Sequence, residues 1–531
     1  MLVLWAAAGI AGAQTAALYA DKQPAIPAQP CIAANGVHNA ASAAPIFLFD
    51  SSIAQGSIFS IYGTNLGPGS SPALAFPLQT TLAGVSVQVS SGSTTVNAIP
   101  IFVGPDQINA ILPGSTPTGS ATVTIAYNGQ TSNAVSFQVI ANSLGIFTVG
   151  STGAGAGIIT GANNQLYSVN SPANPGDAAT IWGTGLGASP GDNGSSPPQQ
   201  IDMPTLPLTV YVGAQQTAVT YRGRSVFTGE DQINFVVPSG ITGCFVPVAV
   251  QIGNVVSNFV TMPIAPAGQS CPDPVIGLGS FNGSPPTGNV TLTRSMMIGT
   301  TTSTTDSGQA FFGDPQILAS PPAPPVSGNP YNLPSGTCIG GVMVQGVFDL
   351  LVNVLDAGPA ITITGPQSSQ QLLASASYSA QFGGGSGANA QPLYLNAGAY
   401  TASGPGGSEV GAEVGPFSQN FTIPQPLTWT NQGNITTVDR FASLEVTWTG
   451  GDPNSTVQIT GNFATFICNA NTSNQHFIIP AFVLLSLAPS SGTSTSDLTL
   501  STTSTTAFTA SGISSGTINS VVTIAKNVTY H

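Results

Sequence analysis

Gly63-Thr64-Asn65-Leu66-Gly67, followed later by Asp106-Gln107-Ile108-Asn109, decides the fold because the pair occurs twice. Gly183-Thr184-Gly185-Leu186-Gly187 repeats the first motif at an offset of 120 residues, and Asp231-Gln232-Ile233-Asn234 repeats the second at an offset of 125. One unit has therefore been duplicated, with five additional residues between the motifs of the second copy. Shared motif positions predicted to be structural are Gly63, Gly67, Asp106, Asn109, Gly183, Gly187, Asp231 and Asn234.

Both copies carry the period-2 alternation of half-buried strands. In the first copy these alternating residues are Val85, Val87, Val89, Val123 and Ile125, and in the second they are Val210, Val212, Val248 and Val250. Ser132-Asn133 returns as Ser257-Asn258, so the correspondence extends through the whole unit. Short strands separated by close turn signals predict tandem β-sandwiches at residues 45–142 and 143–266.

The rest of the chain divides by composition. Residues 1–44 read as a signal-like segment and linker, and residues 267–336 as a connecting region rich in Pro, Gly and Ser. Alternation resumes in residues 337–531, which predicts a third, divergent β-sandwich. The expected fold class is thus all-β, and 531 residues suffice for several such domains.

Charged residues make up only 5% of the chain, with 6 Lys and Arg against 19 Asp and Glu. Binding to nucleic acid needs clustered cations that neutralise phosphates, and the six cations here form no patch larger than a pair. Nucleic acid and anionic lipid are therefore excluded as expected partners. The partner itself is not identified by the sequence, and an extracellular protein or a polysaccharide is the candidate.

Five cysteines show no CxxC spacing, so neither a zinc site nor a redox motif is indicated. Cys244 and Cys271 bracket the end of the second repeat, and Cys338 and Cys468 both lie in the C-terminal region. In an oxidising compartment these two pairs are the expected disulfides, with buried free thiols as the alternative, and Cys31 is left over.

The amino terminus favours export. Leu2 to Ala13 is a short apolar run that ends in small residues, which is typical of a signal peptide cut near Gln14, although no basic residues precede it. This run and the apolar stretch Phe477 to Leu487 are both too short to span a bilayer, so no transmembrane segment is expected. The expected location is secreted or cell-surface.

No constellation of residues predicts catalysis. His38, His476 and His531 are scattered, and Glu409 and Glu413 sit in a Gly-rich loop typical of solvated turns. The Gly-rich motifs lack the Lys-Ser/Thr of a phosphate loop, so their glycines are expected to permit positive φ in tight turns. No catalytic residue, cofactor or metal ligand is therefore assigned.

Two binding alternatives remain open. Asp106 and Asp231, with the neighbouring amides, could contribute oxygen ligands to calcium, but a structural role is favoured, in which the Asp caps a turn and the amides bond to nearby backbone. Trp182, Trp429 and Trp448 could form a platform for sugar rings if they are exposed in a row, although core packing is favoured.

The paired motifs, with Cys244-Phe245-Val246-Pro247-Val248, resemble the uncharacterised domain found repeatedly at the C-terminal ends of secreted acidobacterial proteins. That domain is similar to the IPT/TIG branch of immunoglobulin-like folds. The resemblance implies a fold and an exported location, and it carries no catalytic residues. The expected function is a secreted, non-enzymatic surface protein with a structural or adhesive role, and the alternative is a carbohydrate-binding accessory protein.

Overall fold

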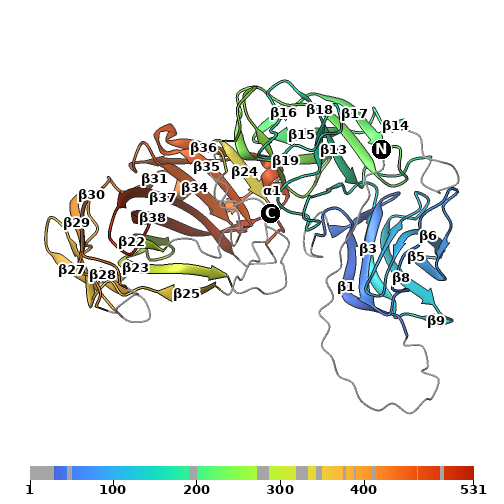
Figure 1. The fold of residues 1–531 in the computed structure, drawn as a ribbon. Helices are drawn as coiled ribbons and strands as arrows, with labels where there is room; N and C mark the ends of the chain where they lie inside the picture. The colour runs from blue at the N-terminus through green and yellow to red at the C-terminus, as the bar shows by residue number, and fades with distance from the viewer. Residues whose placement is uncertain are drawn as a thin grey trace, which may run out of the picture.

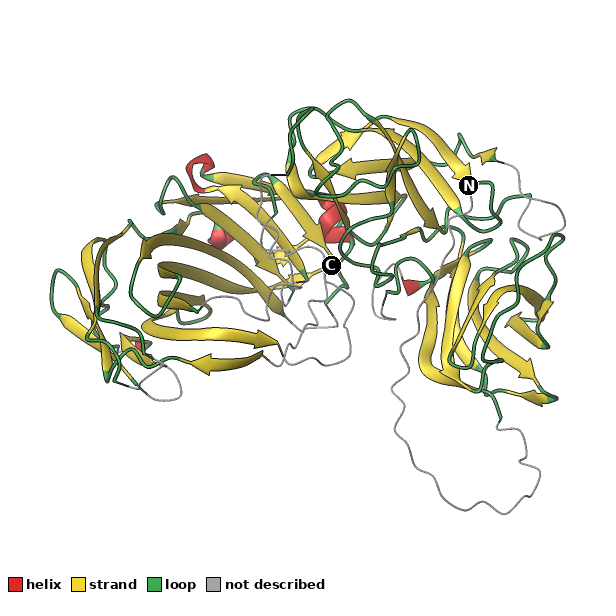
Figure 2. Ribbon diagram, viewed as in Figure 1, coloured by secondary structure: helices red, strands yellow, loops and turns green. Residues whose placement is uncertain are grey.

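The computed structural model describes residues 29–44, 51–190, 200–271, 286–317, 333–341, 350–374, 378–387, 390–408, 413–462, 465–490 and 495–531. The predicted signal segment and its cleavage site lie outside the described residues. Strands dominate, and helices are confined to a few short turns (Figure 2). The predicted all-β fold class is confirmed.

The first repeat is a two-layered sandwich. Its strands are β1 (Cys31–Asn39), β2 (Ile53–Ala54), β3 (Ile58–Thr64), β4 (Thr81–Leu82), β5 (Val85–Ser91), β6 (Thr94–Val103), β7 (Gln107–Ile111), β8 (Gly119–Tyr127), β9 (Gln130–Thr131) and β10 (Val135–Ile140). Eight of them follow the order β1-β3-β7-β6-β5-β8-β10-β2, while β4 pairs with β5 and β9 with β8. Strand β6 pairs with β5 along its first half and with β7 along its second half, where the register shifts between Pro100 and Phe102. It therefore passes from one layer to the other.

The second repeat has two separate sheets. Its strands are β11 (Gly145–Ile146), β12 (Ile159–Gly161), β13 (Ala178–Thr184), β14 (Ile201–Asp202), β15 (Leu208–Val212), β16 (Gln215–Thr217), β17 (Val219–Arg224), β18 (Asp231–Val236), β19 (Gly243–Ile252), β20 (Val255–Val256) and β21 (Val260–Ile264). One sheet has the order β11-β13-β18-β17-β14, and the other has the order β16-β15-β19-β20.

Each repeat closes around its own core. The alternating residues Val85, Val87 and Val89 are fully buried in the first repeat, and Val210 and Val212 in the second. These residues belong to separate hydrophobic clusters. The alternation therefore predicted the inward faces of these strands correctly.

Strand β1 was not predicted, because residues 1–44 were assigned to a signal segment and linker. Its Ile32 and Val37 are buried, and it pairs with β3 across an irregularity in register. The strand is rich in Ala and Asn and lacks regular alternation, so its pairing depends on backbone hydrogen bonds that leave little trace in side-chain pattern.

The C-terminal part is built on one long sheet. Its strands are β22 (Thr287–Ile298), β23 (Ser303–Ile317), β24 (Thr337–Gly340), β25 (Leu350–Val354), β26 (Ala360–Thr364), β27 (Ser369–Leu373), β28 (Tyr378–Gly385), β29 (Gly398–Gly404), β30 (Phe417–Ile423), β32 (Thr437–Val438), β34 (Thr456–Gly461), β35 (Phe466–Asn471), β37 (Ser496–Phe508) and β38 (Ser515–Tyr530). A small sheet holds β31 (Thr428–Trp429), β33 (Leu444–Thr449) and β36 (His476–Ile479), and α1 (Ala481–Leu485) is accompanied by two 3-10 turns, η5 (Gln432–Asn434) and η6 (Thr472–Asn474).

The connecting region predicted at residues 267–336 instead supplies two central strands. Strands β22 and β23 lie in the middle of the long sheet, whose strand order is β24-β35-β34-β37-β38-β22-β23-β28-β27-β26-β29-β30. Strand β22 runs parallel to β38 in a regular register of twelve pairs. The prediction was wrong there because Thr, Ser and Asn occupy alternate positions, and a strand whose outer face is polar and uncharged resembles a linker in composition.

Two hydrophobic cores, rather than the single one of a simple third sandwich, pack on this sheet. One contains Trp448 and Tyr530, and the other contains Phe312 and Tyr400. Between them lies a buried ion pair in which Arg294 Nε and Nη2 donate to the two Asp306 carboxylate oxygens at 2.8 and 2.7 Å. Asp306 also accepts the Tyr394 backbone N–H at 2.7 Å, so this pair holds the loop before β29 in place.

Candidate functional site at the joint between the repeats

In the second repeat, the two motifs meet at a buried carboxylate. Asp231 is fully buried, and its Oδ2 accepts the backbone N–H groups of Gly185 at 2.6 Å and Leu186 at 2.7 Å. The prediction that the Asp caps a turn is therefore confirmed in this copy. The carboxylate satisfies two amides of the turn that would otherwise be buried without partners.

The first repeat makes the same turn with backbone groups alone. The Leu66 N–H donates to the Pro105 carbonyl at 2.9 Å, and the Gly63 N–H donates to the Asp106 carbonyl at 3.0 Å. The Asp106 side chain is exposed, so the expectation that it caps the turn was wrong for this copy. The hairpin before β7 is short enough for its own carbonyls to reach the turn, whereas the longer hairpin before β18 is not.

A buried ion pair lies at the hairpin between β17 and β18. Arg224 and Asp231 are paired across the two strands, and their side chains form an ion pair of which 3% and 0% is exposed. Arg224 Nη2 also donates to the carbonyls of Gly187 and, in the first repeat, Gly56. Sequence reasoning missed Arg224, and the spacing of the motifs gives no signal for it.

The hydrogen bonds of this cluster continue across the boundary between the repeats. The Ile58 N–H donates to Thr184 Oγ1 at 2.8 Å, and Thr184 Oγ1 donates to the Gly229 carbonyl at 2.6 Å. Asn39 Nδ2 donates to the carbonyls of Ser143 at 3.0 Å and Thr184 at 3.2 Å. Thr184 therefore links the second motif of one repeat to the first strands of the other.

An apolar cluster surrounds these polar contacts. It joins Ile58, Ile99 and Ile111 of the first repeat to Phe147 of the second, with the half-buried Trp182 packed against it. Gly229, at φ +79°, fits against Ile58 and Ile111, where any side chain would be crowded. We call the ion pair, the Thr184 and Asn39 bonds and this cluster the inter-repeat joint.

The glycines of the motifs have two different roles. Gly187 has a positive φ of 114°, as predicted, but Gly63, Gly67 and Gly183 do not. A Cβ on Gly63 would collide with the Cys31 carbonyl, and one on Gly183 with the Gly145 carbonyl. The close approach of β1 and β11 therefore explains Gly63 and Gly183, while Gly67 lies against the Gly104 carbonyl. The prediction of positive φ was wrong for all three.

The motif asparagines bond to side chains instead of the predicted backbone. Asn109 Oδ1 accepts Ser60 Oγ at 2.9 Å, and Asn234 Oδ1 accepts Thr180 Oγ1 at 3.0 Å. In each repeat the preceding Gln also donates to the Asn, at 2.9 Å. The adjacent isoleucine points into the core as predicted, since Ile108 is 0% and Ile233 1% exposed.

The repeated Ser-Asn dipeptide fastens the first strand of each repeat. Asn133 Oδ1 and Nδ2 bond to the N–H and carbonyl of Ile32 at 2.8 and 3.0 Å. Asn258 bonds to the N–H and carbonyl of Ile146 in the same way, at 2.7 and 3.0 Å. The equivalence of β1 and β11 therefore explains why the dipeptide recurs.

The electrostatics of the joint oppose a calcium site. Burial raises the pKa of Asp231, while Arg224 and the turn amides act in the opposite direction. Burial also raises the pKa of Glu230, whose carboxylate accepts a bond from Ser225 Oγ at 2.6 Å. A calcium ion at Asp231 would have to displace the guanidinium. Within the described ranges, no group of three or more His, Cys, Asp or Glu residues could hold a metal.

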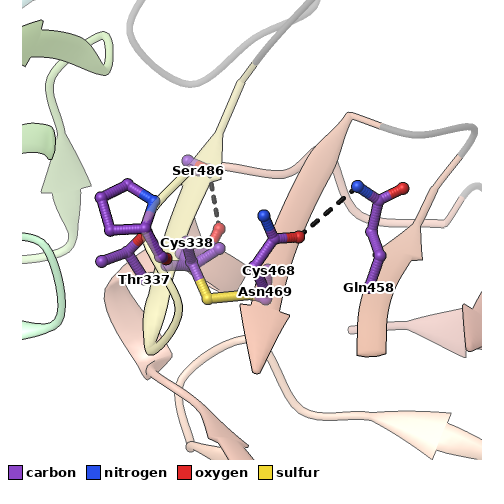
Figure 3. The surroundings of a disulfide bond; sticks show 8 residues. Thr337, Cys338, Gln458, Cys468, Asn469 and Ser486 are labelled. Atoms are coloured by element: carbon purple, nitrogen blue, oxygen red, sulfur yellow. Dashed lines mark hydrogen bonds between the residues drawn. A yellow bond between two sulfur atoms is a disulfide. The ribbon is translucent and has the colours of Figure 1, made fainter. Parts of the chain in front are cut away.

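Both expected disulfides form. Cys244 is bonded to Cys271, and Cys338 to Cys468, across Cα separations of 5.3 and 4.0 Å. Figure 3 shows the second bond between β24 and β35, with Asn469 beside it accepting a bond from Gln458. Cys31 is an exposed free cysteine.

A second joint connects the second repeat to the C-terminal part. The Tyr211 and Phe482 rings stack with centroids 3.8 Å apart at 13°, and the Phe259 ring is also stacked on Phe482, with centroids 5.9 Å apart. Phe482 belongs to α1, so this short helix supplies the apolar contact. Ala249, Val256 and Phe259 thereby join the same cluster as Trp448.

The remaining candidates do not converge on a catalytic site. His38 Nδ1 lies 3.1 Å from the Ala44 carbonyl, and His476 is exposed beside Asn474. Glu413 is exposed, and Glu409 lies outside the described residues. Trp429 and Trp448 are 3% and 1% exposed, so these two are core residues and do not form a sugar platform.

The IPT/TIG domain family matches residues 45–139. This match and the two-layered sheets support the predicted Ig-like β-sandwich, and they do not test the finer resemblance to secreted acidobacterial domains. No curated protein sequence matches the chain. No helix of the described residues is long and apolar enough to cross a membrane.

Solved structures with similar arrangements include the plexin A4 extracellular region (14% identity, 43% of this chain and 17% of that chain, TM-score 0.16). Domains 5-6 of the S-layer protein SbsC align at 13% identity over 45% of this chain and 100% of that chain (TM-score 0.18). The Bacteroides ovatus protein SGBP-B, solved with a mixed-linkage heptasaccharide, aligns at 9% identity over 87% and 92% (TM-score 0.13).

Proposed function

We propose that this chain is an exported, non-enzymatic protein of the cell surface with a structural or adhesive role. The observation that carries the proposal is the inter-repeat joint. A buried ion pair, Arg224 with Asp231, and an apolar cluster fix one β-sandwich on the next, and the Tyr211 and Phe482 stack fixes the C-terminal part on the second repeat. Rigid spacing of modules serves a load-bearing or ligand-presenting protein.

Further support comes from the disulfides and the surface chemistry. Two disulfides are typical of proteins that fold in an oxidising compartment. The apolar amino-terminal run and the resemblance to secreted acidobacterial domains agree with export. Low charge favours recognition through uncharged polar loops and sheet edges.

Surface labelling tests this proposal. Antibody raised against the purified chain should label intact cells of the source organism, and brief protease treatment of those cells should remove the label. A deletion strain should lose adhesion or envelope integrity, and the wild-type gene should restore it. Label found only after lysis would overturn the proposed location, and an unchanged surface phenotype would overturn the proposed role.

A pull-down identifies the partner class. Purified protein is incubated with isolated cell envelopes and with neutral polysaccharides, in parallel with and without a calcium chelator. Retention on envelopes that is insensitive to chelation is expected, because the Asp231 carboxylate is paired with Arg224. Loss of both retention and thermal stability on chelation would reinstate a metal role.

A further inference from the structure

Strand β30 is an open edge of the long sheet. It pairs with β29 through seven consecutive residues without a register shift, and it is the last strand in the sheet order. Figure 1 places β29 and β30 at the end of the molecule farthest from the first repeat. No described strand pairs with its outer side, so the backbone N–H and carbonyl groups on that side can accept a further strand.

Several other sheet edges among the described residues are short, irregular or covered. Strands β14, β16 and β31 have two or three residues, and β1 is irregular in register. Strand β21 is covered on its outer side, where Thr261 exchanges backbone bonds with Gly155 and Gly157. These are the usual ways in which natural sheets block pairing with another chain. Strand β30, by contrast, is seven residues long and regular in register.

The sequence of β30 also lacks protective residues. Phe-Ser-Gln-Asn-Phe-Thr-Ile contains no charge, Pro or Gly, and Phe417, Phe421 and Ile423 are buried while Ser418, Asn420 and Thr422 are exposed. A second copy would therefore meet neither like-charge repulsion nor a missing donor along this strand.

The strand is complementary to itself. Antiparallel pairing centred on Asn420 places Asn420 opposite Asn420 of a second copy and Ser418 opposite Thr422, so that uncharged hydrogen-bonding side chains face one another. This register uses all seven residues. The Asn420 carbonyl now accepts a bond from Gln419 Nε2 at 2.8 Å, and an incoming strand can replace that side chain as the donor.

We propose that β30 is a self-association site, at which two copies of this chain pair edge to edge about a two-fold axis near Asn420. The pairing joins two long sheets into one and connects two molecules tip to tip. A contact of one strand pair is smaller than a standard protein interface, so the dimer dissociates on dilution. This inference is independent of the proposed function.

Cysteine crosslinking of the full chain tests the register in a Cys31→Ser background. Facing residues in an antiparallel pair have Cα atoms roughly 4.5–5.5 Å apart, within the range that a disulfide spans. Asn420→Cys should therefore give a reducible dimer under mild oxidation. Thr422→Cys alone should not, because the two Thr422 positions lie about 14 Å apart. A mixture of Ser418→Cys and Thr422→Cys chains should crosslink.

Sedimentation velocity provides the second measurement. Wild-type protein should show a concentration-dependent shift from monomer to dimer, and Asn420→Lys should abolish it by placing two like charges opposite one another. Asn527→Lys, an exposed position on the interior strand β38, is the matched control and should leave the dimer intact. Crosslinking without this register selectivity, a monomer at every concentration, or a dimer that survives Asn420→Lys with an unchanged fold would each overturn the proposal. If Asn420→Lys does not fold, the crosslinking pattern alone decides.

Discussion

Replacing Arg224 by Met tests the ion pair that fixes the inter-repeat joint. The substitution keeps most of the apolar stem but leaves the Asp231 carboxylate, which is 0% exposed, without its counter-charge. Removing one partner of a buried pair costs about 3–5 kcal/mol of stability. The Gly56 carbonyl of the first repeat also loses its donor, so the opening of both repeats becomes easier.

The loss should depend on pH. Burial already raises the pKa of Asp231, and without Arg224 this pKa rises further. A carboxyl group whose folded-state pKa is raised takes up a proton more readily in the folded state. The loss of folding stability caused by the buried, unpaired carboxylate is therefore absent at low pH, and it grows as the pH rises through that pKa. The Arg224→Met chain should therefore be closer to wild type at pH 5 than at pH 8.

Hydrogen exchange with mass spectrometry on the full chain measures this locally. At pH 8, peptides covering β13 and β18 should show a loss of protection that corresponds to about 3–5 kcal/mol of stability. Peptides from β26 to β30 should keep their protection. Adding Asp231→Asn to Arg224→Met should restore part of the protection, because the amide oxygen still accepts the Gly185 and Leu186 N–H groups without a charge. A loss below about 1 kcal/mol at pH 8, or no recovery in the double variant, would refute the reasoning.

Three further outcomes are expected. Gly183→Ala should lower the free energy of unfolding in urea by more than about 2 kcal/mol, because the added Cβ would collide with the Gly145 carbonyl. Gly92→Ala is the control: the added Cβ has open space, so only the φ of +59° is unfavourable and the loss should be about 1 kcal/mol. Equal losses in the two variants would contradict the role assigned to close backbone approach. Replacing Cys338 and Cys468 together by Ser opens a link across 130 residues and should cost about 4–5 kcal/mol, and an unchanged melting temperature would show that the link does not restrain the unfolded chain. Burial raises the pKa of Tyr394 to about 12, so this phenol ionises in the unfolded chain at a lower pH than in the folded chain. The melting temperature should therefore fall as the pH rises from 10 towards 12, and Tyr394→Phe should make that fall less steep. An equally steep fall in the variant would assign the effect to other groups.

The fold could be predicted from the repeated motifs because the strand pattern and the turns between strands are encoded by residues close together in the sequence. Alternation identified the buried faces of β5 and β15, and the matched offsets revealed the duplication. The motif Asp was assigned to a turn on the same grounds, and this is right for Asp231. It is wrong for Asp106, since a shorter hairpin lets backbone carbonyls do the same work.

The parts that sequence reasoning missed depend on contacts between distant segments. Arg224 was assessed only as an isolated cation, because its partners include Gly56, 168 residues earlier in the chain. Strands β22 and β23 were taken for a connecting region because their outward residues are Thr, Ser and Asn, and only the pairing of β22 with β38 makes them the centre of a sheet. Composition alone does not distinguish such a strand from a linker.

The central claim is that the two repeats and the C-terminal part form one rigid array, and a distance distribution tests it most directly. Spin labels are placed at Thr131→Cys in the first repeat and Thr505→Cys in the C-terminal sheet, both exposed positions, in a Cys31→Ser background. Pulsed electron-electron double resonance should give one narrow distribution that broadens when Arg224→Met is added. A broad or multimodal distribution in the otherwise unaltered chain would contradict the claim.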